Sequence, residues 1–273
     1  TGVSVTGGIV GSTDATINGI TVGKGTNSIG GNTAFGVNAF SANSSGSSNT
    51  GIGYHALENH TSGTNNTALG TFAGDEITTG SANTAIGSGT LSAITTGSNH
   101  TACGSGALTA NTTGTQNTAV GRSAGATNTT GSSLTAVGYL ALNLNTSGSH
   151  NVAVGSGCLQ QNTTGQLNVG VGTANLNDNT TGQKLTAVGH AALMSNTTAN
   201  DNTAVGYHAL NLNTTGSSNT AVGVAALDAN TTGTQNVAIG LQALDSNTTA
   251  SNNTAVGFSS LLSNTTGPDK VAV

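Results

Sequence analysis

The sequence has few of the residues from which most binding and catalytic sites are built. Only 5% of its 273 residues are charged, against roughly 25% in an ordinary soluble domain, and 3% are aromatic. It has one Pro, one Met and no Trp. Its four basic residues are too few to form the positive stripe that a phosphate backbone or an anionic membrane surface requires. We therefore expect no nucleic-acid binding and no electrostatic attachment to membranes.

Long apolar runs and cysteine frameworks are also lacking. No stretch approaches the roughly 18 consecutive apolar residues of a membrane-spanning helix, and the first residues do not read as a signal peptide. We expect no membrane insertion in this segment. Two cysteines do not make a disulfide framework. Cys103 and Cys158 occupy different positions of the repeat described next, and we expect both to be small buried thiols.

The residues that are abundant recur with a fixed period. A Gly recurs every 17 residues without an insertion or deletion, and the sequence between reads N-T-A-V-G-x-x-A-L-x-x-N-T-T-G-S-x. The recurring Gly stands at positions 36, 53, 70, 87, 104, 121, 138, 155, 172, 189, 206, 223, 240 and 257. A disordered linker tolerates changes in length, whereas stacked coils require each residue to lie over its equivalent in the next coil. The fixed period therefore indicates stacking rather than disorder.

This repeat predicts an all-β fold, a parallel β-solenoid or β-roll of 17-residue coils. Seventeen residues are too few for a helix, a strand and two turns, so we expect two short strands and two turns per coil. Residues 32–267 would form one solenoid of 14 repeats, about 65–70 Å long at the spacing of β-strands. Residues 1–31 are expected to be an irregular β segment that enters and caps the first coil. Residues 268–273 read as the start of a further repeat or a linker.

The residue before each recurring Gly is branched or bulky and apolar in nearly every repeat, with Cys103 in the same position. Alternation along a strand places the Ala or Gly that precedes it on the opposite face. We predict that the larger residues fill the core of each coil and that the small ones face a three-fold axis, where they leave room for two further chains. The predicted core column is Val120, Val137, Val154, Val171, Val188, Val205, Val222, Ile239 and Val256. The predicted axis column is Ala68, Ala85, Ala102, Ala119, Ala136, Ala153, Ala187, Ala204, Ala221, Ala238 and Ala255.

Other columns predict the rest of the coil. The Leu of each Ala-Leu pair, such as Leu108, should close the core from the opposite side. Asn recurs before the strand, as at Asn117, and at the start of N-T-T-G, as at Asn111. We expect these side chains to form hydrogen-bonded ladders along the axis. Asn-Thr-Thr also matches the glycosylation sequon, but glycans on coils ~4.8 Å apart would collide, which favours a structural role.

The strand motif resembles that of a known family. The segments N-T-A-V-G at 117–121 and N-V-A-I-G at 236–240 resemble the head repeat of YadA-type trimeric autotransporter adhesins. This resemblance implies three identical chains, each a left-handed parallel β-roll, with Ala towards the trimer axis and branched residues filling each roll. The present repeat is longer by a loop that carries N-T-T-G. The segment at 16–25 followed by such repeats also looks like phage tail-fibre proteins.

Catalytic and metal sites are not expected. The six histidines differ in repeat phase, and His55 and His208 would lie roughly 43 Å apart at strand spacing, so we expect surface or turn roles for all six. Three copies of one histidine could still meet on a trimer axis. Asp228 and Asp245 share a column in adjacent coils, a spacing that superficially suits a hydrolase, but their column favours a solvated turn. We therefore predict no enzyme and no cofactor. Tyr54, Tyr139 and Tyr207, each directly after a recurring Gly, are expected to make sparse exposed contacts.

These features favour a non-enzymatic structural and attachment fibre. We expect the shaft or head of a phage tail fibre or bacterial surface adhesin, extracellular or on a virion or cell surface. Its expected partners are copies of itself in a homotrimer and a host-surface receptor or polysaccharide. One alternative is a monomeric ice-binding solenoid. The adjacent residues Thr112 and Thr113 speak against it, because neighbouring residues of an extended chain face opposite sides and a flat ice-binding face needs Thr on one side. Another is a self-assembling extracellular filament.

Overall fold

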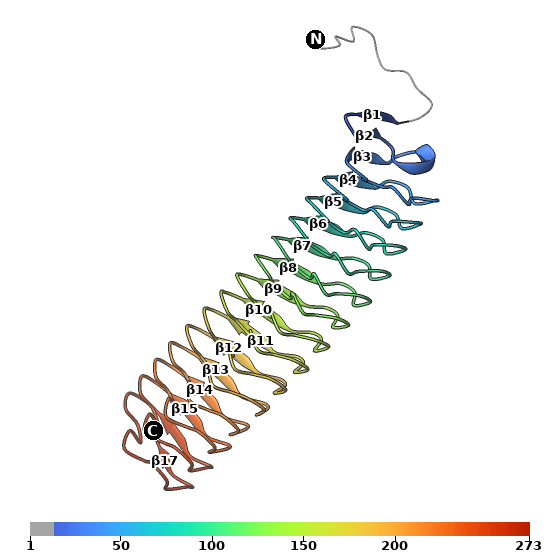
Figure 1. The fold of residues 1–273 in the computed structure, drawn as a ribbon. Coiled ribbons are helices and arrows are strands. Elements are labelled where there is room, and N and C mark those ends of the chain that lie inside the picture. Colours follow the sequence, from blue (N-terminus) through green and yellow to red (C-terminus); the bar gives the residue numbers. More distant parts are fainter. Residues whose placement is uncertain (1–13) are drawn as a thin grey trace.

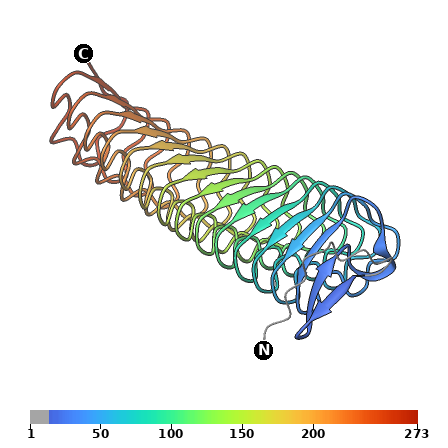
Figure 2. The same ribbon diagram turned by 90° about the horizontal axis from the view of Figure 1, so that it is seen from above.

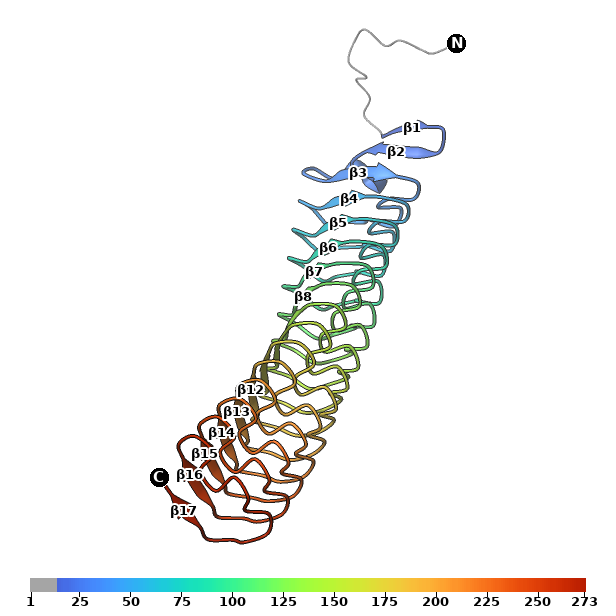
Figure 3. The ribbon, with the colours of Figure 1, turned by 90° about the vertical axis from the view of Figure 1, so that its left-hand side faces the viewer.

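The chain forms one long rod of stacked coils (Figure 1). The structure is a computed structural model and describes residues 14–273. Its regular elements are short β-strands apart from one 3-10 turn, Thr26–Ser28. The strands lie side by side along one side of the rod, as the view in Figure 2 shows, and the stack curves gently between its ends (Figure 3). The predicted all-β parallel solenoid is confirmed.

The strands of the solenoid recur at the predicted period. They are β3 (Thr33–Gly36), β4 (Thr50–Ile52), β5 (Thr67–Leu69), β6 (Thr84–Ile86), β7 (Thr101–Cys103), β8 (Thr118–Val120), β9 (Thr135–Val137), β10 (Val152–Val154), β11 (Val169–Val171), β12 (Thr186–Val188), β13 (Thr203–Val205), β14 (Thr220–Val222), β15 (Val237–Ile239), β16 (Thr254–Val256) and β17 (Val271–Ala272). A strand and the fourteen residues that follow it are called a rung, and each rung takes the label of its strand.

Adjacent rungs are joined in register around the whole coil. In the sheet, Thr118 pairs with Thr135 in parallel orientation, and every later pair is shifted by the same 17 residues. Outside the sheet, the Leu108 N–H donates to the Ala124 carbonyl at 3.0 Å. In the N-T-T-G loop, the Thr197 N–H donates to the Thr214 carbonyl at 3.1 Å. Stacking therefore supplies backbone hydrogen bonds even where the chain is not a strand.

An antiparallel hairpin covers the first rung. Strands β1 (Ala15–Ile17) and β2 (Ile20–Gly23) pair antiparallel, and β2 pairs antiparallel with β3. This hairpin occupies the sheet edge that β3 would otherwise expose. It falls in the predicted entry segment 1–31, whose residues 1–13 lie outside the described part of the chain.

The expectation of two strands per coil was wrong, because residues 32–273 contain one strand per rung. Tight turns with left-handed residues close the coil instead. In the β7 rung these are Gly106, Leu108 and Gln116, with φ of 67°, 49° and 60°. The three equivalent positions hold no Val, Ile or Thr in any rung of this Thr-rich chain. Branching at Cβ makes the left-handed conformation costly, so the absence of these residues follows from the backbone.

The recurring Gly is required for a second reason. Gly121 has φ of 133°, and a Cβ there would lie 2.5 Å from the carbonyl oxygen of Gly138 on the next rung. Any side chain at this corner would collide with the backbone that stacks on it, which explains why the column is Gly throughout.

The core is the reverse of the predicted one. Strand Ala side chains point into the coil, where Ala119 is fully buried, whereas Val120 points outward and is 38% exposed. The coil is narrow at the strand, and the Ala-Leu pairs already fill it, so only a methyl group fits there. The predicted role of Leu is confirmed, since Leu108 and its equivalents are buried.

Both predicted columns are corrected accordingly. Buried inside the coil, and therefore turned away from any axis outside it, are Ala68, Ala85, Ala102, Ala119, Ala136, Ala153, Ala187, Ala204, Ala221, Ala238 and Ala255. Exposed or half-buried on the outer surface, and not in the core, are Val120, Val137, Val154, Val171, Val188, Val205, Val222, Ile239 and Val256.

Two ladders of buried Asn complete the interior, as predicted. In the turn Asn column, which opens N-T-T-G, Nδ2 of Asn162 donates to Oδ1 of Asn145 at 2.7 Å, and this bond repeats on successive rungs from Asn128 to Asn264. In the strand Asn column, directly before each strand, Oδ1 of Asn117 accepts the Leu134 N–H at 3.0 Å. These bonds satisfy polar groups in a core that has little apolar surface.

Candidate interaction surfaces

The outer sheet face is a continuous, uncharged surface of Thr and apolar side chains along the rod. It consists of the first and third side chains of strands β3 to β16, a Thr or Val followed by a branched or bulky apolar residue. Phe35 is 50% exposed, Leu69 46% and Ile239 40%, and neither column contains a charged residue. At strand geometry the face is about 65 Å by 10 Å, or about 650 Å². The largest apolar patch on a typical monomer is roughly 300–600 Å² and is often functional.

The two cysteines are not equivalent. Cys103 lies on the outer sheet face between Ile86 and Val120 and is partly exposed, so the expectation that it is buried was wrong. Cys158 is buried in the core as predicted, and burial raises the pKa of its thiol to about 12. A thiol with so high a pKa carries almost no thiolate near neutral pH and is chemically inert.

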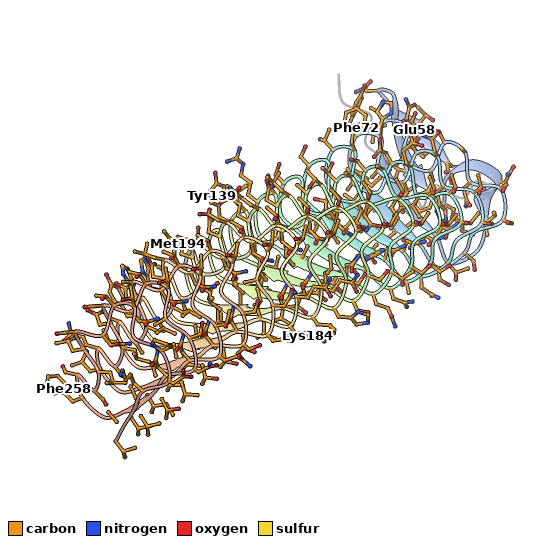
Figure 4. All side chains as sticks on the ribbon, turned by 90° about the horizontal axis from the view of Figure 1, so that it is seen from below. Glu58, Phe72, Tyr139, Lys184, Met194 and Phe258 are labelled. Carbon is orange, nitrogen blue, oxygen red and sulfur yellow. The ribbon has the colours of Figure 1, made fainter. Side chains whose placement is uncertain are left out.

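Rings and apolar side chains gather along the corner beside this face. We call this row of side chains the ring edge. Its members lie one or two positions after the recurring Gly. Its members are Tyr54, His55, Phe72, Arg122, Tyr139, His190, Tyr207, His208, Val224, Leu241 and Phe258. Figure 4 labels Phe72 and Tyr139 on one side of the rod, with Lys184 on the other. The expected exposure of the three Tyr is confirmed.

At the N-terminal end of the ring edge, three rings pack together on the β4 and β5 rungs. Tyr54 and Phe72 meet edge to face with centroids 5.4 Å apart. The His55 ring contacts both, at 4.0 Å from Tyr54 and 5.1 Å from Phe72. His55 Nδ1 is hydrogen-bonded to the Glu58 carboxylate, which Figure 4 places beside Phe72.

A partly buried carboxylate lies next to this cluster. Burial is the largest effect on Asp75 and raises its pKa to about 6, with smaller contributions from the neighbouring charges of Glu76 and Glu58. Its Oδ1 is buried and has no hydrogen-bond partner. An ionised Asp75 is therefore poorly accommodated in this turn.

A second group of rings lies on the β12 and β13 rungs. His190 and Tyr207 stack with centroids 5.4 Å apart and planes 14° apart, and His208 lies over Tyr207 at 4.1 Å. Burial is the largest effect on Asp228 and raises its pKa. The charge of His208 lowers this pKa, and the charge of Asp245 raises it further. Asp228 is half-buried, with Oδ1 unpartnered, so the predicted solvated turn was only partly correct.

Two histidines are buried where surface or turn roles were expected. His60 replaces an Asn of the turn Asn column and His100 an Asn of the strand Asn column, and both are fully buried. Burial lowers the pKa of each ring below its ordinary value. The sequence signal was the replacement of a ladder Asn in both cases.

The Asn of each sequon is also committed to the interior. Asn162, for example, is fully buried, and its Nδ2 donates to Asn145 Oδ1 and to the Gly165 carbonyl. In the folded rod this nitrogen is not accessible to a glycosylating enzyme. The structure thus favours the structural role of N-T-T-G.

Within residues 14–273, no group of three or more His, Cys, Asp or Glu side chains is arranged to hold a metal ion. That part of the chain also has no helix long and apolar enough to cross a bilayer. No protein-family model, curated protein or solved structure matches the chain.

Proposed function

We propose that the chain is the shaft or head of a non-enzymatic attachment fibre, assembled as a homotrimer through the outer sheet face. The observation that carries this proposal is the length of that face, which runs through fourteen strands from β3 to β16 without a charged residue. Its area of about 650 Å² approaches the roughly 800 Å² that each partner buries in a standard specific interface.

A cyclic trimer suits the geometry of this surface. Each rod offers one long, narrow face without charged residues, and three such faces can meet around an axis that runs along the rods. Thr and branched side chains, such as Thr186 and Val188, would then interlock between chains while the Asn ladders stay inside each chain. The resemblance of the strand motif to trimeric adhesin heads supports the number of chains, but not their facing, because it implied Ala at the axis and here the branched residues would face it.

We assign attachment to the ring edge, which lies at the corner of each rod beside the outer sheet face. Aromatic rings next to carboxylates and histidines provide apolar contact and hydrogen bonds together, as polysaccharide recognition requires. A linear glycan could contact successive rungs. Such a fibre would act outside the cell, on a virion or on a cell surface. Loss of glycan binding in Tyr207→Ala, with Thr181→Ala on an exposed loop as control, would support this assignment.

The oligomeric state tests the assembly. Light scattering should give three times the chain mass of 26.2 kDa. The double variant Val171→Glu, Val188→Glu places charges on the outer sheet face and should yield a folded monomer. Thr181→Glu, on the exposed N-T-T-G loop, should leave the trimer intact. A parental chain that is monomeric at micromolar concentration would refute the trimer, and a dimer would show that the face pairs two-fold instead.

One observation favours a second function, ice binding by a monomer. The outer sheet face presents Thr and Val two residues apart on six rungs, as at Thr203 and Val205, and both point outward. Thr112 and Thr113 lie in the N-T-T-G loop and not on this face. Thermal hysteresis by a monomeric parental chain, abolished in the double Glu variant, would establish ice binding and exclude the fibre.

A further inference from the structure

The interior is not uniform along the rod. From Asn128 to Asn264 the turn Asn column is an unbroken ladder of amide hydrogen bonds. Before Asn128 the same column contains Asn43, His60, two Ile and Asn111, and neither amide atom of the buried Asn111 has a partner. The N-terminal rungs thus lack the amide bonds of the turn Asn column that connect the later rungs, although they keep those of the strand Asn column.

His100 takes the place of an Asn in the strand Asn column and makes equivalent bonds. Its Nε2 donates to the Gly114 carbonyl at 2.8 Å, and its Nδ1 accepts the Asn117 N–H at 3.2 Å. In the next rung Asn117 does the same, since Nδ2 donates to Gly131 and Oδ1 accepts the Leu134 N–H. This pattern requires a neutral imidazole with the proton on Nε2.

A proton on Nδ1 would oppose this arrangement. The protonated ring has no acceptor nitrogen, so it would face the Asn117 N–H with a second donor and break the link to the next rung. The ring is also fully buried, where a charge is poorly solvated. Acid therefore acts directly on a bond between rungs.

No neighbouring charge compensates a protonated His100. Residues 77–121 contain no Asp, Glu, Lys or Arg, and Cys103, their other titratable group, lies on the outer sheet face. Asp75 and Glu76 on the preceding rung and Arg122 on a later one are not bonded to the ring. Burial, opposed only by the bonds to Gly114 and Asn117, lowers the pKa of His100 from its ordinary 6.5.

We propose that His100 makes the section from β6 to β8 an acid-sensitive joint, which loosens at low pH while the rungs from β9 onward remain stacked. The later rungs have only Asn and Leu in the two Asn columns through Asn264, so no titratable group interrupts their ladders. The device depends on bonds within one chain and holds whether or not the chain is a trimer.

His60 can add to this sensitivity from the β4 rung. Its Nδ1 lies 3.0 Å from the Ile77 carbonyl, while its Nε2 lies 3.2 Å from Asn49 Nδ2 and 2.9 Å from the Gly63 carbonyl. Phe40 packs edge-on against the ring. The carboxylates Glu58, Asp75 and Glu76 lie on the same and the next rung and complicate its titration, so His100 provides the cleaner test.

Hydrogen exchange measured by mass spectrometry tests the joint on the intact chain. Neutral His100 stabilises the section fully above pH 6.5, and this contribution is lost as the pH falls below 6.5. After correction for the pH dependence of chemical exchange, the opening equilibrium around Asn117 should rise by up to ~10-fold per pH unit below 6.5. The rungs of β13 to β15 should show no such rise.

Two variants make the test specific. His100→Asn restores the residue found before most other strands, so it should fold, keep both bonds and lose the local acid response. His150→Asn changes an exposed histidine and should leave the response intact. The proposal is overturned if His100→Asn retains the parental acid response, or if exchange increases equally along the whole rod.

Discussion

A Cβ atom on Gly170 would lie 2.5 Å from Sγ of Cys158 and 3.0 Å from Oδ1 of Asn175. Gly170 is the middle residue of β11, where most rungs have Ala, and the other two replace the Ala of an Ala-Leu pair. Extra volume on one wall of the coil is thus matched by a missing methyl group on the other. The same holds at Gly51, where a Cβ would lie 2.7 Å from the Phe40 ring.

We predict that Gly170→Ala destabilises the rod by ~1–3 kcal/mol through overpacking. Cys158→Ala alone should cost less, because it leaves a small cavity. The double variant should recover most of the stability, because the new methyl group occupies the space of the sulfur. Urea denaturation of the four proteins measures the coupling. Additive effects of the two substitutions would contradict the contact.

The corrected orientation of the strands predicts opposite effects at neighbouring positions. Ala187→Val adds two methyl groups inside the narrow coil and should lower the unfolding free energy by ~1–3 kcal/mol. Val188→Ala removes them from the outer surface and should have little effect on the stability of one chain. Circular dichroism in a monomeric background made by Val222→Glu and Ile239→Glu, which leaves Val188 free and separates folding from assembly, should rank the two in that order. The reverse order would restore the original core assignment.

Cys103 offers a chemical test of the proposed trimer. If the outer sheet faces meet around a three-fold axis, three Cys103 thiols lie at one level on the contacting faces, and a disulfide forms between two of them if their Cα atoms come within ~7 Å. Oxidation should therefore link two chains of each trimer and leave one thiol free. Cys103→Ser should abolish the cross-link, since Cys158 is buried. A Cys placed at Thr113 in that background should not cross-link, and failure of Cys103 to cross-link would argue against this axis.

Asp75 predicts a pH dependence opposite in sign to that of His100. Because its folded pKa is raised from 3.8 to about 6, ionised Asp75 destabilises its turn above pH 6, and this penalty disappears as the pH falls to 3.8. Asp75→Asn should therefore raise the thermal midpoint at pH 7.5 and have little effect at pH 4. Asp201→Asn, at an exposed position, is the control. Equal effects of Asp75→Asn at both pH values would contradict the assignment.

Much of the fold could be predicted because its signals are periodic. The Gly spacing fixed the coil length, and the recurrence of Asn predicted ladders such as that through Asn162. Which side chains of the strand point into the coil and which point outward could not be predicted in the same way. Alternation shows that Ala119 and Val120 point in opposite directions, but not which one enters the coil. The width of the cavity decides that, and it depends on how the Leu108 turn closes.

The candidate surfaces were harder to predict for a related reason. Because Val120 was expected to lie in the core, neither the outer sheet face nor the exposure of Cys103 was predicted. The second strand was expected because the left-handed turns that replace it leave only a weak signal in the sequence. Positions such as that of Gln116 are recognisable only because no branched residue occurs there. A surface or turn role is expected for His100 as for the other histidines, whereas its place in an Asn column indicates burial.

The contacts between rungs join residues 17 positions apart, and this makes the length of the rod adjustable in units. Excision of residues 220–236 would connect Asn219 to Val237, and Asn219 would take over the bonds that Asn236 makes to Ala250 and Asn253. Excision of sixteen or eighteen residues would shift every Asn out of its ladder. The distance that the rod spans can therefore change in steps of ~4.8 Å while its cross-section and the two columns of its outer sheet face continue unchanged.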